Sequence, residues 1–278
     1  MELPEPSQAL LRSARALQRK QAREDAGRFL VEGRQAVTEA LAAPGVVETL
    51  FVRWSSALPN SDLVELADEL EIPVYALSEQ NLATLTDTVT PQGVVAVAKA
   101  VDVPLERVFT PTLPLGGDTE RGLPRLVVIC AQIRDPGNAG TVIRCADAFG
   151  ADAVILSTES VELYNPKVVR ASTGSIFHLP IVTEVELGTA IDACRTAGMQ
   201  VFAADGSAET DLTDIAGRLA QPTAWVMGNE SWGLPLEHLA LADQTVAVPI
   251  YGNAESLNLA TAAAVCLYSS ATAIRKVS

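Results

Sequence analysis

The stretch "RLVVICAQIRDPGNAGTVIRCADAFGAD", residues 125–152, contains an apolar strand, a glycine-containing turn and an amphipathic helix. The continuous apolar run at its start is typical of a strand that is covered on both faces of a parallel sheet. Its glycines match neither G-x-G-x-x-G nor G-x-x-x-x-G-K-[ST], the spacings that cradle a nucleotide phosphate. The turn instead offers Asn138 and Arg144. It is therefore a strand-to-helix turn of another kind.

The helix after this turn is expected to start near Ala139 and to end at Gly150. Its buried face is expected to consist of Val142, Ile143, Ala146 and Phe149. Arg144 then lies on the opposite face, and the free N–H groups near Asn138 favour an anion. A simpler alternative is that Arg144 only pairs with Asp147 at i,i+3, which is worth about 0.2–0.5 kcal/mol.

Helices and strands alternate on both sides of the segment "TPTLPLGGDTERGLPR", residues 110–125, whose prolines and glycines resist regular structure. The N-terminal part is expected to begin with a helix over 8–25 and to continue as a small α/β domain. In the second part, strands are expected at 125–131, 153–157, 200–205, 224–228 and 245–250, and helices at 139–149, 166–173, 187–197 and 256–275. The sequence thus predicts an N-terminal domain over 1–107, a linker over 108–124 and a parallel-sheet α/β domain over 125–278.

Two further segments place glycine and polar residues directly after expected strands. In "AWVMGNESWGLP", residues 224–235, Gly228 ends the strand and Glu230 follows it in a turn. In "VAVPIYGNAESLNLATAAAV", residues 246–265, Ser256 is expected to cap the last helix, with Asn258 inside its first turn. Each residue alone could be a solvated turn or cap residue. Ligands of parallel sheets bind at the carboxyl ends of the strands, so the combination predicts one site.

Charge and cysteine usage limit the functional classes. A net charge of −14 argues against a protein that coats nucleic acid nonspecifically. A basic stripe is nevertheless expected on the first helix, formed by Arg12, Arg15, Arg19 and Arg23. It is either a solvated face or a local RNA-contacting patch. The widely spaced cysteines (Cys130, Cys145, Cys194 and Cys266) predict buried thiols in a reducing compartment and no metal site. Without an apolar signal core or membrane-length apolar run, we expect a cytoplasmic protein and no membrane partner.

The three segments together resemble the motifs of the SpoU/TrmH family of RNA 2'-O-ribose methyltransferases, within the knotted SPOUT superfamily. The first motif is matched by Asn138, Gly140 and Arg144, the second by Gly228, Glu230 and Gly233, and the third by Pro249, Gly252, Ser256 and Asn258. The chain departs from the family at Ile250, where Met is common, and at Ser269, where an acidic residue is common. Neither departure changes a polar residue that is expected to act.

The resemblance implies a C-terminal parallel-sheet domain with a trefoil knot and a homodimeric active site. It also implies a small N-terminal α/β RNA-binding domain that resembles ribosomal proteins, which "GRFLVEG" at 27–33 matches less strongly. S-adenosylmethionine is the implied cofactor, held by Gly228, Val248, Leu257, Ile250 and Ala204. The implied catalytic residues are Arg144, Asn138, Glu230, Ser256 and Asn258. RNA contacts are expected from Arg12, Arg15, Arg19, Arg23, Arg28 and Arg144.

Within this resemblance, Arg144 would either take the proton of the ribose 2'-hydroxyl or stabilise the developing alkoxide. We favour stabilisation, because the pKa of arginine lies above about 12. The separate N-terminal domain resembles rRNA enzymes, including the thiostrepton-resistance methyltransferases, and favours 23S rRNA as substrate. The alternatives are a tRNA 2'-O-methyltransferase and a nonenzymatic RNA-binding protein on the same fold. A nicotinamide-dependent oxidoreductase is disfavoured, since G-x-G-x-x-G is absent.

Overall fold

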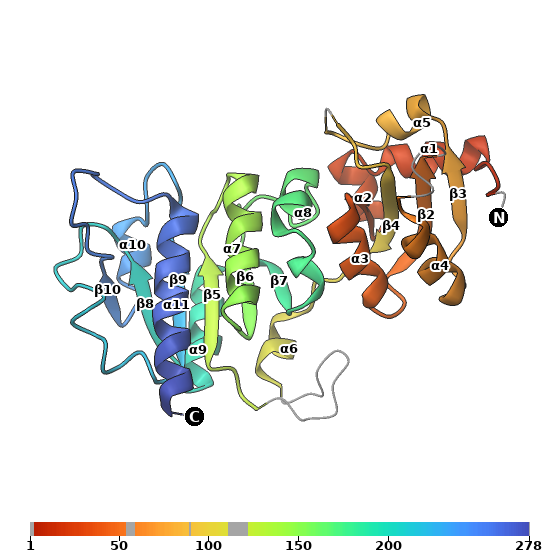
Figure 1. Cartoon of the computed structure of the whole chain (residues 1–278). Coiled ribbons are helices and arrows are strands. Elements are labelled where there is room, and N and C mark those ends of the chain that lie inside the picture. Colours follow the sequence, from red (N-terminus) through yellow and green to blue (C-terminus); the bar gives the residue numbers. More distant parts are fainter. Residues whose placement is uncertain (1–2, 54–58, 89, 111–121, 278) are drawn as a thin grey trace. The chain divides into compact units, whose positions relative to one another are not determined.

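The computed structural model describes residues 3–53, 59–88, 90–110 and 122–277. The chain divides into two compact units, which are described separately (Figure 1). Unit 1 comprises Met1–Val101 and Tyr164–Phe177, and unit 2 comprises Asp102–Leu163 and His178–Ser278. Most of the linker expected over 108–124 lies outside the described residues.

Unit 1 is built on a mixed sheet with the strand order β1-β4-β2-β3. The strands are β1 (Arg28–Glu32), β2 (Val47–Arg53), β3 (Val74–Leu77) and β4 (Val94–Lys99). Strand β4 runs antiparallel to both β1 and β2, whereas β2 and β3 are parallel. The helices are α1 (Gln8–Ala16), α2 (Lys20–Ala26), α3 (Arg34–Ala42), α4 (Ser61–Glu69) and α5 (Glu79–Ala83). The expected alternation of helices and strands is therefore confirmed.

The continuous first helix expected over 8–25 is wrong, because the chain breaks between Ala16 and Lys20. Leu17 closes α1 by donating its N–H to the carbonyl of Ala14, and Arg19 then adopts an extended conformation with φ −99° and ψ 135°. Helix α2 starts after this extended residue. The break changes the direction of the backbone, so side chains before and after it no longer share one helical stripe.

A segment from the second half of the sequence completes unit 1. It contains helix α8 (Pro166–Ser172) and a short 3-10 turn (Ser175–Phe177). The ring of Tyr164 lies 4.4 Å from that of Phe29, and its hydroxyl accepts the N–H of Val101 at 2.6 Å. A Cβ at Gly174 would lie 2.4 Å from the Cγ of Glu39 on α3, so the packing is tight there. Residues 164–177 thus group with unit 1. The domain bounds expected from the sequence, 1–107 and 125–278, assign the same residues to the second domain.

Unit 2 is built on a parallel sheet with the order β10-β8-β9-β5-β6-β7. Its strands are β5 (Leu126–Cys130), β6 (Ala153–Ser157), β7 (Ile181–Val185), β8 (Gln200–Ala204), β9 (Thr223–Met227) and β10 (Gln244–Val246). Its helices are α6 (Leu105–Phe109), α7 (Pro136–Ala148), α9 (Leu187–Thr196), α10 (Leu236–Leu239) and α11 (Leu259–Val277). The expected parallel α/β sheet is confirmed, but β7, α6 and α10 were missed.

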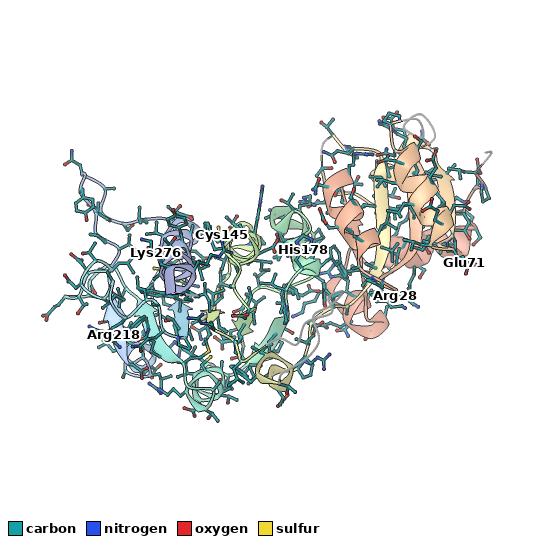
Figure 2. The ribbon with its side chains drawn as sticks, turned by 60° about the horizontal axis from the view of Figure 1, so that its bottom comes forward. Arg28, Glu71, Cys145, His178, Arg218 and Lys276 are labelled. Atoms are coloured by element: carbon teal, nitrogen blue, oxygen red, sulfur yellow. The ribbon has the colours of Figure 1, made fainter. Side chains whose placement is uncertain are left out.

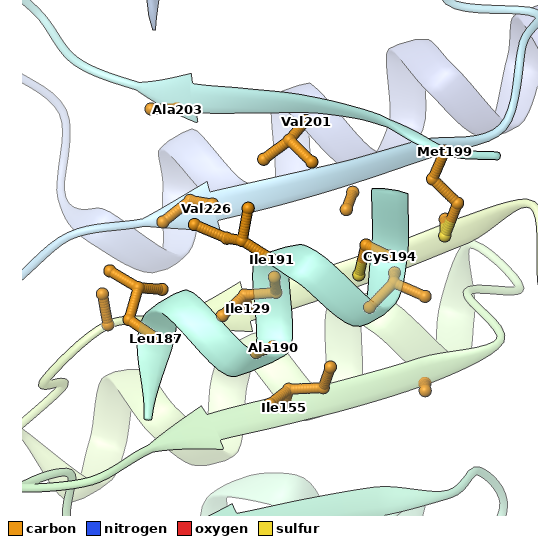
Figure 3. Close-up of a cluster of buried hydrophobic side chains, with 14 of the residues drawn as sticks. Ile129, Ile155, Leu187, Ala190, Ile191, Cys194, Met199, Val201, Ala203 and Val226 are labelled. Atoms are coloured by element: carbon orange, nitrogen blue, oxygen red, sulfur yellow. The ribbon is translucent and has the colours of Figure 1, made fainter. Parts of the chain in front are cut away.

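Both faces of this sheet are covered, which explains the continuous apolar runs in its strands. Strand side chains alternate between faces. On one face, alternate residues such as Ile129 and Val226 pack against α9, as Figure 3 shows. On β9 the neighbouring Trp225 is fully buried, and its indole N–H donates to Ser270 of α11 at 2.9 Å. Helix α11 also packs against α7. Burial beside the sheet therefore explains the apolar residues on one side of α11, whereas Tyr268 on this helix is exposed.

Candidate active site

The loop between β5 and α7 places the first polar residue of the site. Asp135 caps α7, since its carboxylate accepts the backbone N–H of Asn138 at 2.7 Å. Pro136 follows at the first helical position, where its missing N–H carries no cost. The helix therefore begins at Pro136 rather than near Ala139, and Asn138 belongs to its first turn instead of preceding it.

The expected faces of α7 are confirmed for Val142, Ile143 and Ala146, which are buried, and for Arg144, which is exposed. Phe149, which was also expected on the buried face, follows the helix and is only half-buried. The chain turns at Gly150 with φ +70°, a conformation that favours glycine. The Oδ2 of Asp147 and the Nδ1 of His178 share a hydrogen bond of 2.8 Å. The alternative in which Arg144 only pairs with Asp147 did not include this partner.

The second segment forms a tight loop after β9. Asn229 and Gly233 exchange backbone hydrogen bonds of 2.9 Å in both directions, so the loop closes on itself. A Cβ at Gly228 would lie 2.6 Å from the carbonyl carbon of Gly233 and 2.8 Å from the Cγ of Leu234. The loop's own backbone packs closely against Gly228, which leaves no room for a side chain at this position.

This loop holds Glu230 against the amino end of α7. The Glu230 carboxylate accepts the backbone N–H groups of Arg134 and Asp135 at 3.4 and 3.3 Å. It also accepts the side-chain amide of Asn138 at 3.2 Å. Backbone N–H groups at a helix amino end favour negative charge. The anion that the sequence predicted at this end is therefore supplied here by the protein's own carboxylate.

The third segment contributes Asn258, and here the expected capping was wrong. Helix α11 begins at Leu259, and the Asn258 side-chain oxygen accepts the N–H groups of Ala260 and Thr261 at 2.9 and 3.4 Å. Asn258 is thus the N-cap, whereas Ser256 lies two residues further out on an exposed loop. Asn and Ser are about equally good caps, so the sequence alone did not separate them.

A hydrogen-bonded chain joins the three segments. The Asn258 amide donates to the side-chain oxygen of Asn138 at 3.0 Å, and the amide of Asn138 donates to Glu230. We call Glu230, Asn138 and Asn258 the polar network. Each of the two asparagines uses both ends of its side-chain amide, so each holds the next side chain in a fixed orientation. The convergence that was expected at the carboxyl ends of the strands is present for these residues.

A cavity of about 250 Å³ lies beside the polar network at the ends of β8, β9 and β10. The five residues expected to hold the cofactor all line it, namely Ala204, Gly228, Val248, Ile250 and Leu257. Glu230 and Ser256 line it as well. Arg144 is absent from the described lining. It lies six residues beyond Asn138, which is about 9 Å along the helix axis at 1.5 Å per residue.

A residue that was missed supports the same region. Asn229 is buried, donates its side-chain amide to the carbonyl of Gln132 at 2.7 Å and accepts the N–H of Ser231 at 2.8 Å. It therefore ties the loop after β9 to the loop after β5. Asn229 adjoins Glu230 without any distinct spacing, so the sequence did not identify it. Asp205, which follows Ala204 directly after β8, also lines the cavity.

The N-terminal arginines fall into different environments. Arg12 and Arg19 are exposed. Arg15 donates to Thr84 and Asn81 at 2.6 and 2.9 Å. Arg23 is buried and donates to the carbonyl of Leu17 at 2.8 Å. A single four-arginine stripe is therefore wrong.

Arg28, labelled in Figure 2, forms an ion pair on the surface of unit 1. Its Nη2 lies 3.1 Å from the Oε1 of Glu48, which opposes its charge locally. The same pairing raises the pKa of Arg28, first through the hydrogen bond and then through the charge of Glu48.

The cysteines do not supply reactive thiolates. Burial raises the pKa of Cys130, Cys194 and Cys266 to about 12, and the charge of Glu230 adds to the effect at Cys130. Cys145 is half-buried, and burial raises its pKa as well, against the opposing charge of Arg144. Within the described ranges, no group of three or more His, Cys, Asp or Glu side chains could hold a metal ion. None of the helices in those ranges is long and apolar enough to cross a membrane.

Comparisons with known proteins match both units to one kind of protein. Residues 125–268 match the SpoU rRNA Methylase family, and residues 30–104 match the domain described as RNA 2'-O ribose methyltransferase substrate binding. A 23S rRNA (guanosine(2553)-2'-O)-methyltransferase of Bacillus subtilis is 35% identical over 91% of this chain and 92% of its own.

Solved structures are similar over nearly the whole chain. The SpoU methyltransferase AviRb from Streptomyces viridochromogenes, in complex with the cofactor AdoMet, has a TM-score of 0.79 at 30% identity. The match covers 97% of this chain and 99% of that one. An AdoMet-bound rRNA methyltransferase from Sinorhizobium meliloti has a TM-score of 0.76 at 28% identity and covers 97% of both chains.

Proposed function

The chain belongs to the SpoU rRNA methylase family, and on that premise we propose that it transfers a methyl group from S-adenosylmethionine to a ribose 2'-hydroxyl of 23S rRNA. One observation carries the proposal. The polar network joins all three family motifs at the rim of a cavity whose lining contains every residue expected to hold the cofactor. The 23S rRNA substrate is supported by the Bacillus subtilis relative, which is a 23S rRNA 2'-O-methyltransferase. On this proposal the protein acts in the cytoplasm, where it meets the rRNA.

The cavity suits S-adenosylmethionine chemically. Ile250 and Leu257 are 38% and 37% exposed, although both are apolar and line the cavity. A ligand with an apolar face would cover them and remove that surface from water. Glu230 and Asp205 bring carboxylates to the same cavity, and carboxylates favour a sulfonium cation. When bound, S-adenosylmethionine supplies an electrophilic methyl group. The backbone at Gly228 and the side chains of Val248, Ile250 and Leu257 would hold it.

The polar network would orient the ribose. The Glu230 carboxylate has about four lone-pair positions, so beyond its backbone and amide donors it can accept one further hydrogen bond from a ribose hydroxyl. Asn138 and Asn258 would fix the direction of that carboxylate. Ser256 lines the cavity from an exposed loop and would act only if the loop closes over the ligand.

Arg144 would stabilise the developing alkoxide and the neighbouring phosphate. A guanidinium can hold both oxygens through its planar fork of donors. It is a poor base, because deprotonating it at neutral pH is costly. We therefore assign it electrostatic stabilisation of the transition state rather than proton abstraction.

A second copy of the chain would bring Arg144 to the reaction. Within one chain, Arg144 lies about 9 Å along α7 from Asn138. Tyr268 of α11 is 59% exposed, and its ring lies edge-on to that of Phe149, the residue after α7, with the ring centres 5.6 Å apart. A homodimer that covers this apolar surface of α7 and α11 would bury Tyr268 and place Arg144 at the interface. The knotted path of the C-terminal chain belongs to the same proposal.

Methyl transfer to defined RNA tests the proposal. Purified protein is mixed with tritiated S-adenosylmethionine and with either 23S rRNA or total tRNA from a strain that lacks the gene. We expect label in 23S rRNA at one ribose, located by its resistance to alkaline cleavage. Label in tRNA alone would transfer the assignment to the tRNA alternative. If S-adenosylmethionine binds in calorimetry but neither RNA is labelled, the nonenzymatic alternative is correct. Binding of NAD instead would favour the oxidoreductase.

A further inference from the structure

An arginine–tryptophan pair lies beside the polar network. The guanidinium carbon of Arg134 lies 5.1 Å from the centre of the Trp232 ring. Trp232 is nevertheless 49% exposed, although tryptophan is usually highly buried. The family motifs, as they match this chain, use Gly228, Glu230 and Gly233 of this loop and leave Trp232 without a role.

The pair is held by the same contacts that hold Glu230. The backbone N–H of Arg134 donates to the Glu230 carboxylate, and the paired backbones of Asn229 and Gly233 close the loop around Trp232. One ring face is therefore occupied by a guanidinium from the loop after β5. Such an interaction fixes the orientation of an aromatic ring that its own loop leaves half exposed.

The location of the ring specifies what it could meet. Its loop neighbours Glu230 and Gly233 line the cavity, whereas Trp232 is not among the described residues of that lining. The ring therefore stands next to the cavity rather than within it. A nucleotide whose ribose reaches Glu230 would carry its base past the cavity rim toward this ring.

We propose that Trp232, supported by Arg134, is a stacking platform for the base of the nucleotide that receives the methyl group. The proposal rests on the proposed function and adds a positioning residue to it. Sequence-specific RNA enzymes commonly stack unpaired bases on aromatic side chains or on guanidinium planes, and this pair offers both. Stacking would fix the base and thereby orient the attached ribose toward the polar network. Because every base has a π-face, the platform holds the nucleotide in place without selecting its identity.

The test is single-turnover methyl transfer to 23S rRNA from a strain that lacks the gene, at saturating S-adenosylmethionine and with varied RNA concentration. The variants are Trp232→Ala and Trp232→Phe, and the matched control is Leu236→Ala. Leu236 is apolar and 84% exposed in the same stretch of chain but belongs to no part of the site. Loss of one stacked base should lower the apparent second-order rate constant by about five- to 150-fold in Trp232→Ala. Trp232→Phe should recover most of the rate, and Leu236→Ala should match the parent protein.

Cofactor affinity and assembly state distinguish base stacking by Trp232 from a role in cofactor binding or in a contact between copies. We expect all three variants to bind S-adenosylmethionine as the parent does in calorimetry and to keep its sedimentation coefficient. A parent-like rate in Trp232→Ala would overturn the platform. So would a Phe variant as slow as the Ala variant, since an aromatic ring would then not suffice. Weakened cofactor binding would assign Trp232 to the cofactor, and altered sedimentation would assign it to a contact between copies. Failure of the proposed function itself would appear differently, as a parent protein that labels no RNA.

Discussion

Two regions of the molecule collect polar side chains in opposite ways. At the carboxyl edge of the unit 2 sheet, Asn138, Glu230 and Asn258 come from distant segments and share hydrogen bonds. In the first turns of unit 1, Arg12 and Arg23 are only eleven positions apart in the chain, yet one is exposed and the other buried. Separation along the sequence therefore says little about which polar residues act together.

The difference follows from what fixes each region. Parallel strands end at the same edge of their sheet, so residues directly after separate strands are brought together by the sheet itself. A helical stripe depends on every intervening residue staying helical, and here one extended residue, Arg19, destroys it. The sheet edge should therefore tolerate few changes in its loops, whereas the arginines should act independently of one another.

The largest effect is expected from Gly228→Val. The new side chain would collide with the backbone of Gly233, displacing the loop that carries Glu230 and closes the cavity. Calorimetry should detect no binding of S-adenosylmethionine. The matched control is Gly188→Val, since a Cβ at Gly188 meets no described atom within 4 Å. Parent-like cofactor affinity in the Gly228 variant would show that the sheet edge adapts more easily than its packing indicates.

Arg144→Ala should lower single-turnover methyl transfer at least about a hundredfold, comparable to the loss of one oxyanion donor. Because Arg144 is exposed, the free energy of unfolding should change by less than about 0.5 kcal/mol. Arg144→Lys should recover little activity, since lysine keeps the charge but lacks the planar fork. Parent-like methyl transfer in the Arg144→Ala variant would remove Arg144 from the chemistry.

Arg23→Ala should destabilise unit 1 rather than weaken RNA binding directly. The substitution removes the hydrogen bond that joins α2 to the carbonyl of Leu17 and leaves a buried acceptor. We expect the free energy of unfolding to fall by about 1.5–3 kcal/mol, as for other hydrogen bonds to a charged group. Urea denaturation of the full chain measures the change, with Arg12→Ala as the exposed comparison. An equal and small loss of unfolding free energy in both variants would instead support one solvated face that contains both arginines.

The smallest effect is expected from replacing the exposed pair, Arg12 and Arg19, by glutamine. If both contact phosphates, the slope of log K against log salt for RNA binding should decrease by about 0.7–0.9 for each contact. Cofactor affinity should stay unchanged. An unaltered slope would make these arginines a solvated surface and would leave the RNA contacts of unit 1 to other residues.

The sequence predicted the meeting of three polar residues at one sheet edge better than it predicted the paths of the loops that carry them. Continuous apolar strands followed by Gly and polar residues located Asn138, Glu230 and Asn258 at one edge, because a parallel sheet leaves few other arrangements. The sequence did not reveal that Asn258 rather than Ser256 caps α11, because both residues satisfy free N–H groups well. It also did not reveal that the backbone of Gly233 packs against Gly228, since that contact forms only when the loop closes on itself.

The broken first helix and the grouping of residues 164–177 with unit 1 have a different origin. The break after Ala16 occurs in a segment of good helix formers, where the buried hydrogen bond of Arg23 and the packing of Leu17 outweigh local propensity. Residues 164–177 pack onto unit 1 through Tyr164 and Gly174, contacts that no periodicity encodes. Tertiary packing thus decides the features for which the local pattern was misleading.

Replacing Glu230 tests the central claim most directly, because this carboxylate connects the loop after β9 to the amino end of α7. Glu230→Gln keeps the size of the side chain but places an amide N–H₂ among the donors of Arg134, Asp135 and Asn138. The control is Glu237→Gln, an exposed carboxylate seven positions further along the chain. At saturating S-adenosylmethionine and 23S rRNA, we expect Glu230→Gln to slow single-turnover methyl transfer at least about a hundredfold, and Glu237→Gln to match the parent. A parent-like rate in the Glu230→Gln variant would contradict the account.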